Sequence, residues 1–332
     1  MSVTLDDPVL TLVCPSPQAL PKMMSQVVTA VEKRGLCILE AWDTQKQTLK
    51  TVAGQMGYIM NHIRGDEDGI VDVAYQRSWH ETSQSNNEIR KEDFQSYSSD
   101  EVPPHSDGAA LDGMDVIGDR IVQIGPPQIV VFQCVEPAEA GGELLLVDMK
   151  KVLVDLLRDR PDIARILLEP GCVSFCRDNQ FALDLPVFQK IGDRWRVRAH
   201  CDNRVFVTDR SAEAMQILFD EYINQPQYTD KILLTSRQIL VIDNYRILHG
   251  RAAYQVFGDR NVRHHRRLWV ASDRLPIFQN FQGEVKMKRA FEPYQAYRIV
   301  TSLDVPVPYP ICCGIPLNDE EREWLVCAEG GF

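Results

Sequence analysis

The sequence predicts a mainly β protein with helical insertions (α+β), built as a β-sandwich or jelly roll (double-stranded β-helix) that begins with a helical segment. Two observations predict this fold: many short β-type runs are separated by polar turns, and only a few helical patterns interrupt them. A third observation argues against the main alternative fold, a parallel βαβ sheet. The sequence contains no GxGxxG or GxxxxGK[ST] loop, the motifs with which such sheets bind nucleotides.

The N-terminal part is expected to consist of helices around one strand. Residues 24–31 carry an apolar stripe at helical spacing, and Gly35 then leads into a short strand at Leu36–Leu39. A second helix is expected to open at Thr44, with Gln47 completing a capping-box pattern.

A long polar loop is expected next, at residues 81–104, where it would form or cover the edge of a binding pocket. Helical patterns return at residues 149–168, where Pro161 splits two short helices, and at residues 210–223. Asn318 and Glu321 predict the start of a final helix. The expected strands of the core are Ile121–Ile124, Gln128–Cys134, Glu143–Val147, Cys172–Cys176, Trp195–His200, Gln238–Ile242 and Arg267–Ala271.

Composition restricts the class of partner. The 332 residues include 36 Lys+Arg and 47 Asp+Glu, and the resulting net charge of −11 argues against a general nucleic-acid coat or a basic membrane-surface protein. No linker interrupts the chain, so we expect a single domain over residues 1–332. Its parts would be a helical segment with a lid-like loop (1–100), a jelly-roll core (101–275) and a C-terminal extension (276–332).

The chain shows no apolar stretch long enough to span a bilayer and no secretory signal. Its nine cysteines include no CxxC pair, which favours reduced thiols over a zinc ribbon or a redox pair. We therefore expect a cytoplasmic protein without membrane contact. The sequence carries no signal for an oligomeric state.

The histidines suggest a metal site. In His105-Ser106-Asp107 an extended backbone would project the imidazole and the carboxylate from one face, and a distant His249 would complete a 2-His-1-carboxylate set of the kind that binds non-haem iron. His200-Cys201-Asp202 has the same HxD spacing. Spacing alone leaves both tripeptides as candidates.

Three stretches resemble, in order, the taurine dioxygenase/clavaminate synthase-like family of iron(II)/2-oxoglutarate-dependent oxygenases. They are Pro103–Gly113, with the HxD tripeptide; Pro126–Leu157, with a strand, a Gly-Gly turn and a short helix; and Val241–Val270, with DNxRxxHGR at Asp243–Arg251. The resemblance selects His105 and Asp107, together with His249, as the ligands of iron(II).

The resemblance also implies an arginine, beyond the distal histidine, that binds the far carboxylate of 2-oxoglutarate. A guanidinium suits this role because its rigid fork grips a carboxylate and stays charged. Alignment on the motif favours Arg263, then Arg267, then Arg260, with Arg251 and Arg266 as further candidates. One departure is Leu144, where the family often has a Thr or Ser whose hydroxyl binds the same carboxylate.

The resemblance thus implies an oxygenase that uses Fe(II), 2-oxoglutarate and dioxygen, releases succinate and CO2, and hydroxylates a small amino-acid-like or carboxylate substrate. Desaturation, cyclisation and action on a carrier-bound or macromolecular substrate use the same ligands. Two rivals come from other classes. One is a nucleic-acid-directed protein with residues 260–267 as a phosphate patch, which the acidic net charge disfavours. The other is a metal-binding jelly roll without catalysis. No substrate-binding residue can be named from the sequence.

Overall fold

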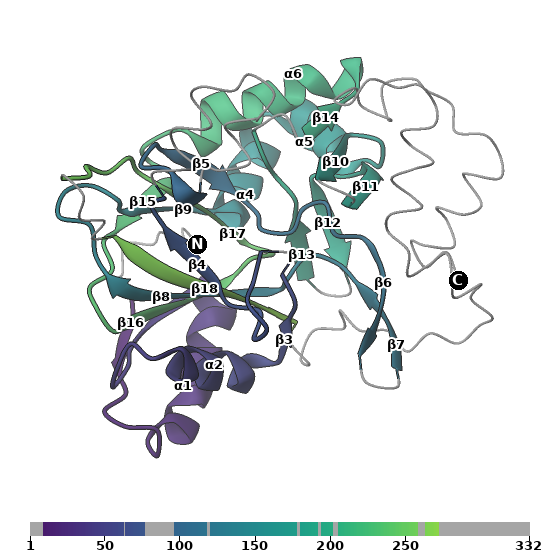
Figure 1. Ribbon diagram of the computed structural model, residues 1–332. Helices are drawn as coiled ribbons and strands as arrows, with labels where there is room; N and C mark the ends of the chain where they lie inside the picture. The colour runs from purple at the N-terminus through teal and green to yellow at the C-terminus, as the bar shows by residue number, and fades with distance from the viewer. Residues whose placement is uncertain are drawn as a thin grey trace. The chain divides into compact units, whose positions relative to one another are not determined.

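A computed structural model describes residues 9–62, 64–76, 96–117, 120–177, 180–191, 194–201, 205–257 and 263–271 (Figure 1). The chain divides into two compact units. The first comprises residues 1–106, 127–152 and 223–274, and the second comprises residues 107–126, 153–222 and 275–332. Within the described residues, no helix has the length and apolar character needed to cross a bilayer.

A seven-stranded sheet forms most of the first unit. Its order is β1-β2-β16-β8-β18-β3, with β4 also paired to β18, and only the β1–β2 pair is parallel. The strands are β1 (Thr11–Val13), β2 (Leu36–Glu40), β3 (Tyr58–Met60), β4 (Val71–Ala74), β8 (Ile129–Glu136), β16 (Gln238–Asp243) and β18 (His264–Ala271).

A second sheet of the first unit has the order β15-β9-β17-β5, and all its pairs are antiparallel. Its strands are β5 (Val102–His105), β9 (Leu144–Asp148), β15 (Thr229–Ile232) and β17 (Ile247–Arg251). Phe132 of β8 meets His249 of β17 edge to face, with ring centroids 5.2 Å apart. Side chains from the two sheets therefore meet inside the jelly roll, as the sequence predicts.

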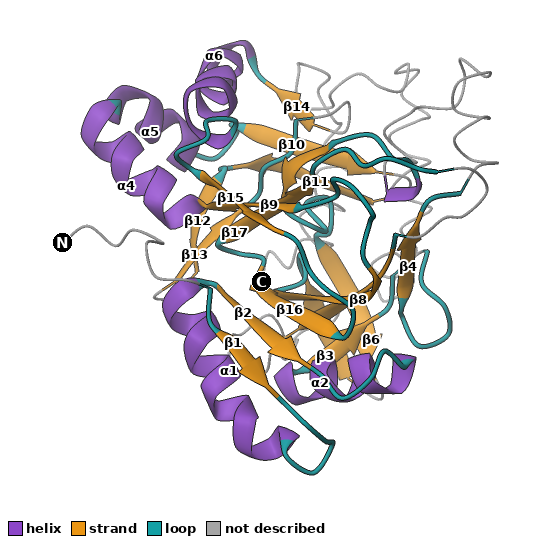
Figure 2. Cartoon of the chain, turned by 90° about the vertical axis from the view of Figure 1, so that its left-hand side faces the viewer, coloured by secondary structure: helices purple, strands orange, loops and turns teal. Residues whose placement is uncertain are grey.

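Two N-terminal helices, α1 (Leu20–Arg34) and α2 (Lys46–Met56), cover the outer face of the seven-stranded sheet (Figure 2). Gly35 ends α1 in the left-handed region at φ 81°, and its N–H donates to the carbonyl of Val31. The apolar stripes of both helices pack in one buried cluster against alternate residues of four strands: Cys37, Leu39, Ile129, Val131, Ile239, Val241, Leu268 and Val270. The other residues of these strands point inward, because side chains alternate between the two faces of a sheet.

Within its described residues, the second unit contains three small sheets and short helices. Helix α4 (Met149–Asp159) leads into it from the first unit. Its strands and helices are β6 (Gly113–Ile117), β7 (Arg120–Ile124), β10 (Val173–Arg177), β11 (Gln180–Leu185), β12 (Phe188–Ile191), β13 (Arg194–Val197), β14 (Val205–Val207), α5 (Pro161–Leu168), α6 (Asp209–Ile217) and the π-helical turn η2 (Leu218–Ile223).

Most predicted elements are confirmed, with three corrections. The capping box at Thr44 is wrong: α2 begins two residues later, and Asp43 instead accepts hydrogen bonds from the Gln45 amide and the Thr48 hydroxyl. The predicted loop at 81–104 ends too late, because Val102–His105 is a strand held by its pairing with β17. The regular α-helix predicted at 210–223 ends at Ile217 and continues as a π-helical turn. The helix expected at Asn318 and residues 81–95 of the predicted loop lie outside the described residues.

Candidate active site

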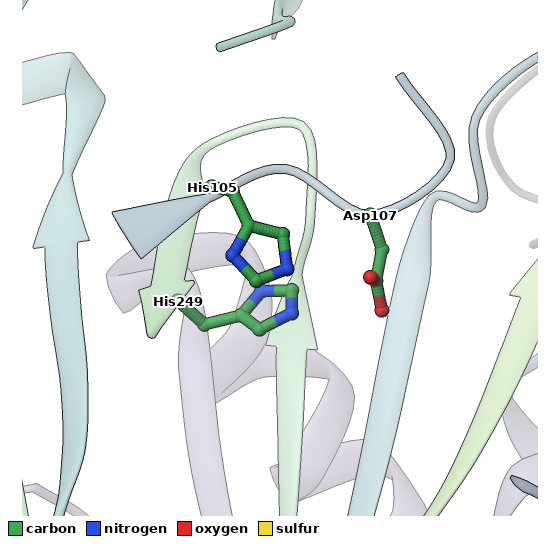
Figure 3. Close-up of side chains that lie close together, drawn as sticks. All are labelled: His105, Asp107 and His249. Atoms are coloured by element: carbon green, nitrogen blue, oxygen red, sulfur yellow. The ribbon is translucent and has the colours of Figure 1, made fainter. Parts of the chain in front are cut away.

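Three of the predicted ligands lie together (Figure 3). His105 ends β5 and pairs directly with His249 of β17, and their ring centroids are 4.8 Å apart. Asp107 follows two residues after His105, and one potential ligand atom from each of the three residues lies within 4.8 Å of the others. Asp107 and His249 are buried, and His105 is half-buried. This is the size and composition of a 2-His-1-carboxylate site.

The orientation of His105 suits metal binding. Its Nδ1 donates a hydrogen bond to the carbonyl of Pro103 at 2.9 Å, which fixes the tautomer whose Nε2 carries a lone pair instead of a proton, the form that binds a metal. Gly250 lets β5 approach, since a Cβ there would lie 2.4 Å from the carbonyl oxygen of Val102. The glycine of the HGR motif thus permits the strand pairing that brings the two histidines together.

The remainder of the DNxRxxHGR signature holds the turn between β16 and β17. Asn244 is buried, and its amide donates to the carbonyl of Pro127 at 2.7 Å. Arg246 binds Asp148 through two hydrogen bonds, of 2.9 and 2.5 Å. Although burial opposes it, this contact with Asp148 raises the pKa of Arg246. These residues position His249 rather than forming the site themselves.

Arg263 is buried and immediately precedes β18. Its Nη2 contacts Nδ1 of His265 at 3.2 Å, and its guanidinium lies 5.4 Å from the ring centre of Tyr254. Burial, reinforced by the nearby charge of Arg251, lowers the pKa of Arg263 to about 10. Its Nε and Nη1 are buried and have no hydrogen-bond partner among the described residues. These two N–H groups can therefore donate to a bound anion.

Arg267 shares the buried inner face but has a different environment. Its Nη2 lies 3.3 Å from Nε2 of His62, and its guanidinium stacks 5.6 Å from the ring centre of Trp269. His62 is buried, and its ring meets that of Trp269 edge to face. No sequence signal connects His62 with Arg267, because the two residues share no motif and come together only through tertiary packing.

The other candidate arginines already have partners within the protein or lie outside the described residues. Arg251 is buried and donates to the carbonyls of Ser98 and Asp100. Arg266 forms an ion pair with Asp72. Arg260 lies outside the described residues.

His200 of the second HxD tripeptide is half-buried after β13, whereas Asp202 lies outside the described residues. The position at which the family often has a hydroxyl is filled by Leu144, which is buried at the start of β9 and pairs with Arg251 of β17. Paired residues of antiparallel strands project from the same face of a sheet. Leu144 therefore points to the same side as Arg251 but offers no hydrogen-bond donor there.

Residues 7–269 match the model of the family described as taurine catabolism dioxygenase TauD, TfdA family. The chain belongs to this family. The predictions of family, jelly-roll fold and non-haem iron(II)/2-oxoglutarate dioxygenase class are therefore confirmed. No curated protein sequence matches the chain.

Three oxygenases are among the proteins with solved structures of similar fold. Asparagine oxygenase, in complex with Fe(II), 3-hydroxyasparagine and succinate, is 15% identical with a TM-score of 0.57, covering 76% of this chain and 81% of its own. The non-haem iron oxygenase OrfP, with Fe, succinate and a dihydroxyarginine, is 13% identical with a TM-score of 0.55, covering 80% and 95%. PvcB from Pseudomonas aeruginosa is 15% identical with a TM-score of 0.53, covering 82% and 91%. At these identities the likeness concerns the fold.

Proposed function

We propose that this chain is an oxygenase whose iron(II) is held by His105, Asp107 and His249. The observation that carries the proposal is the convergence of their ligand atoms within 4.8 Å at two paired strands. Two neutral imidazoles and one carboxylate leave half of an octahedral coordination sphere for the co-substrate and dioxygen. The hydrogen bond from His105 Nδ1 to Pro103 supports the assignment, because it directs the other ring nitrogen to the metal.

Arg263 is the proposed anchor of the distal carboxylate of 2-oxoglutarate. Two of its buried N–H groups lack partners among the described residues, and leaving buried donors unpaired costs free energy that a bound carboxylate would recover. Arg267 ranks second because His62 and Trp269 already surround its guanidinium. Arg260 ranks third.

Iron(II) with bound 2-oxoglutarate supplies the activation of dioxygen, with release of succinate and CO2. The chain's own residues hold and orient these groups. Phe132 packs against His249 and fixes its ring, while the buried inner faces of the two sheets exclude water from the reacting centre. Asp107 contributes the one negative charge of the ligand set.

The proposed reaction is hydroxylation of an unactivated C–H bond in a small amino-acid-like or carboxylate substrate. The fold likeness to asparagine oxygenase and to OrfP, whose complexes contain hydroxylated asparagine and arginine, supports this substrate class.

We also propose that residues 1–332 form one oxygenase domain, because the family model extends across segments of both units. A cytoplasmic location is supported by the free thiols of Cys14, Cys37, Cys134, Cys172 and Cys201.

The ligand assignment can be tested without a substrate. Iron(II) and 2-oxoglutarate, mixed with the protein under anaerobic conditions, should produce the visible charge-transfer band of the chelate. His105→Ala should abolish this band, whereas His200→Ala, the matched variant in the second HxD tripeptide, should retain it. If His200→Ala abolished the band and His105→Ala retained it, the iron ligand would be His200. A wild-type protein without the band would refute the oxygenase proposal.

Substrate class is tested next with a panel of L-amino acids, read as succinate released above the substrate-free background. Stimulation by one or a few members, with the product mass raised by one oxygen atom, is expected. A product lighter by two hydrogen atoms would show desaturation or cyclisation instead. Failure of every small molecule to stimulate turnover would contradict the proposed substrate class.

A further inference from the structure

Tyr254 lies beside the proposed anchor of 2-oxoglutarate, and its ring contacts two buried cations. The guanidinium carbon of Arg251 is 4.9 Å from the ring centre, and that of Arg263 is 5.4 Å away. The backbone fixes this position: the Tyr254 N–H donates to the carbonyl of Ser99 at 3.0 Å, and Tyr254 forms a β-bridge with Gly141. The backbone at Tyr254 is therefore held by two segments distant in sequence.

The hydroxyl of Tyr254 has no hydrogen-bond partner among the described residues, although it is buried. Burial raises the pKa of Tyr254 above its ordinary value despite the two arginines, so the hydroxyl stays protonated and can donate. Arg263, whose guanidinium carbon lies 5.4 Å from the centre of this ring, adds two buried N–H groups that have no partner among the described residues. Unpaired donors around concentrated positive charge require an acceptor that is itself negative.

We propose that Tyr254 donates its hydroxyl hydrogen to the distal carboxylate of 2-oxoglutarate, which Arg263 binds at the same time. This inference rests on the proposed function. It also accounts for Leu144, which projects from the face that carries Arg251 but has no group that can donate. In this chain the hydroxyl that helps to hold the co-substrate comes from the segment after β17 rather than from the start of β9.

The test compares two keto acids in an anaerobic titration of the iron(II) protein, read from the charge-transfer band. The ligands are 2-oxoglutarate and 2-oxopentanoate, which has the same chain length but lacks the distal carboxylate. Tyr254→Phe should weaken 2-oxoglutarate binding by about 10-fold, the size expected for one hydrogen bond to a charged group. Its affinity for 2-oxopentanoate should change by less than about twofold, since no hydrogen bond is lost there.

Stability in the absence of ligand separates this role from a structural one. Because the hydroxyl is unpaired in the ligand-free protein, as far as the described residues extend, Tyr254→Phe should leave the melting temperature unchanged or raise it, and 2-oxoglutarate should stabilise the variant less than the wild type. Tyr222→Phe is the matched control: Tyr222 is also buried, but its charged neighbours are mostly acidic, namely Asp155, Asp159 and Glu221 beside Arg160. It should bind both keto acids like the wild type.

Equal loss of affinity for both keto acids, or no loss for either, would overturn the inference while leaving the proposed function in place. A lower melting temperature of ligand-free Tyr254→Phe would also count against it, because it would show that the hydroxyl already has a partner. A wild-type protein that forms no band with either ligand would instead overturn the proposed function, and this inference with it.

Discussion

Arg263 and Arg266 are three residues apart, yet they have opposite surroundings. On the outer side of β18, Arg266 donates from Nε to Asp72 at 3.3 Å and from Nη1 to the carbonyl of Thr44 at 2.6 Å. On the inner side, Arg263 has no carboxylate partner among the described residues, and two of its nitrogens are unpaired there. The adjacent histidines repeat the contrast, with His264 bound to Asp72 and His265 to Arg263.

The difference is the one expected between a structural cation, Arg266, and the proposed ligand-binding cation, Arg263. The acceptors of Arg266 belong to its own chain, so its charge is balanced in the ligand-free protein. Arg263 is buried and has no such balance among the described residues, and an uncompensated buried charge is strongly unfavourable unless a ligand supplies the opposite charge. The arginine-rich segment therefore contains arginines with two different environments. Which one an arginine has depends on the face of the strand from which it projects, because side chains alternate between the two faces.

The same substitution at both positions gives the largest expected effect. Arg263→Gln should weaken 2-oxoglutarate binding on the order of 100-fold, because it removes the charge that balances the distal carboxylate. Arg266→Gln should change this affinity by less than about twofold, since its contacts lie on the opposite face. Anaerobic titration of the charge-transfer band measures both. If both variants lost 2-oxoglutarate affinity to a similar extent, the assignment of binding to the inner face of β18 and of structural ion pairs to the outer face would be wrong.

Two glycines with the same backbone conformation test how tightly Arg263 is held. Gly142 and Gly171 have φ of 77° and 78°, so alanine should cost each about 1–2 kcal/mol of stability through backbone strain. A Cβ at Gly142 would lie 3.3 Å from Cδ and Nε of Arg263, whereas one at Gly171 would meet nothing within 4 Å among the described residues. Only Gly142→Ala should also weaken 2-oxoglutarate binding, by severalfold. If Gly171→Ala weakened it equally, Arg263 would not be the cause.

His265 provides a pH test of the inner face. Burial, together with the charges of Arg263, Arg251 and His264, holds the pKa of His265 well below that of an ordinary histidine. The unfolded chain therefore binds a proton near pH 6.5 that the folded chain does not, and stability should fall as the pH drops below that value, by up to about 1.4 kcal/mol per pH unit. His265→Asn keeps an acceptor for Arg263 but does not titrate. Urea unfolding at pH 7 and pH 5 should show a smaller loss for this variant than for the wild type, and an unchanged difference would contradict the assignment.

The sequence predicted what depends on local pattern. Alternation and helical spacing were sufficient for most strands and for α1, whereas the HxD spacing left two candidate tripeptides and the family resemblance selected His105 and Asp107, together with His249. The sequence did not identify His62, because its contact with Arg267 joins segments distant in sequence, nor Tyr254, because no motif indicates that its ring lies between Arg251 and Arg263. The capping box at Thr44 failed for a related reason: Asp43, one residue earlier, offers a competing acceptor to the groups that follow it.

The smallest expected effect lies on the outer face, at Asp72. This carboxylate accepts hydrogen bonds from His264 at 2.6 Å and from Arg266 at 3.3 Å, but its side chain is 44% exposed. Solvent screens such pairs, so Asp72→Asn should reduce the free energy of unfolding by less than about 1 kcal/mol, and added salt should shrink the difference further. Affinity for 2-oxoglutarate should not change, because the β18 side chains that Asp72 contacts lie on the outer face of that strand, away from Arg263. A clear loss of co-substrate affinity in this variant would mean that the outer ion pairs help to orient the inner arginine, and the two faces of β18 would then act together.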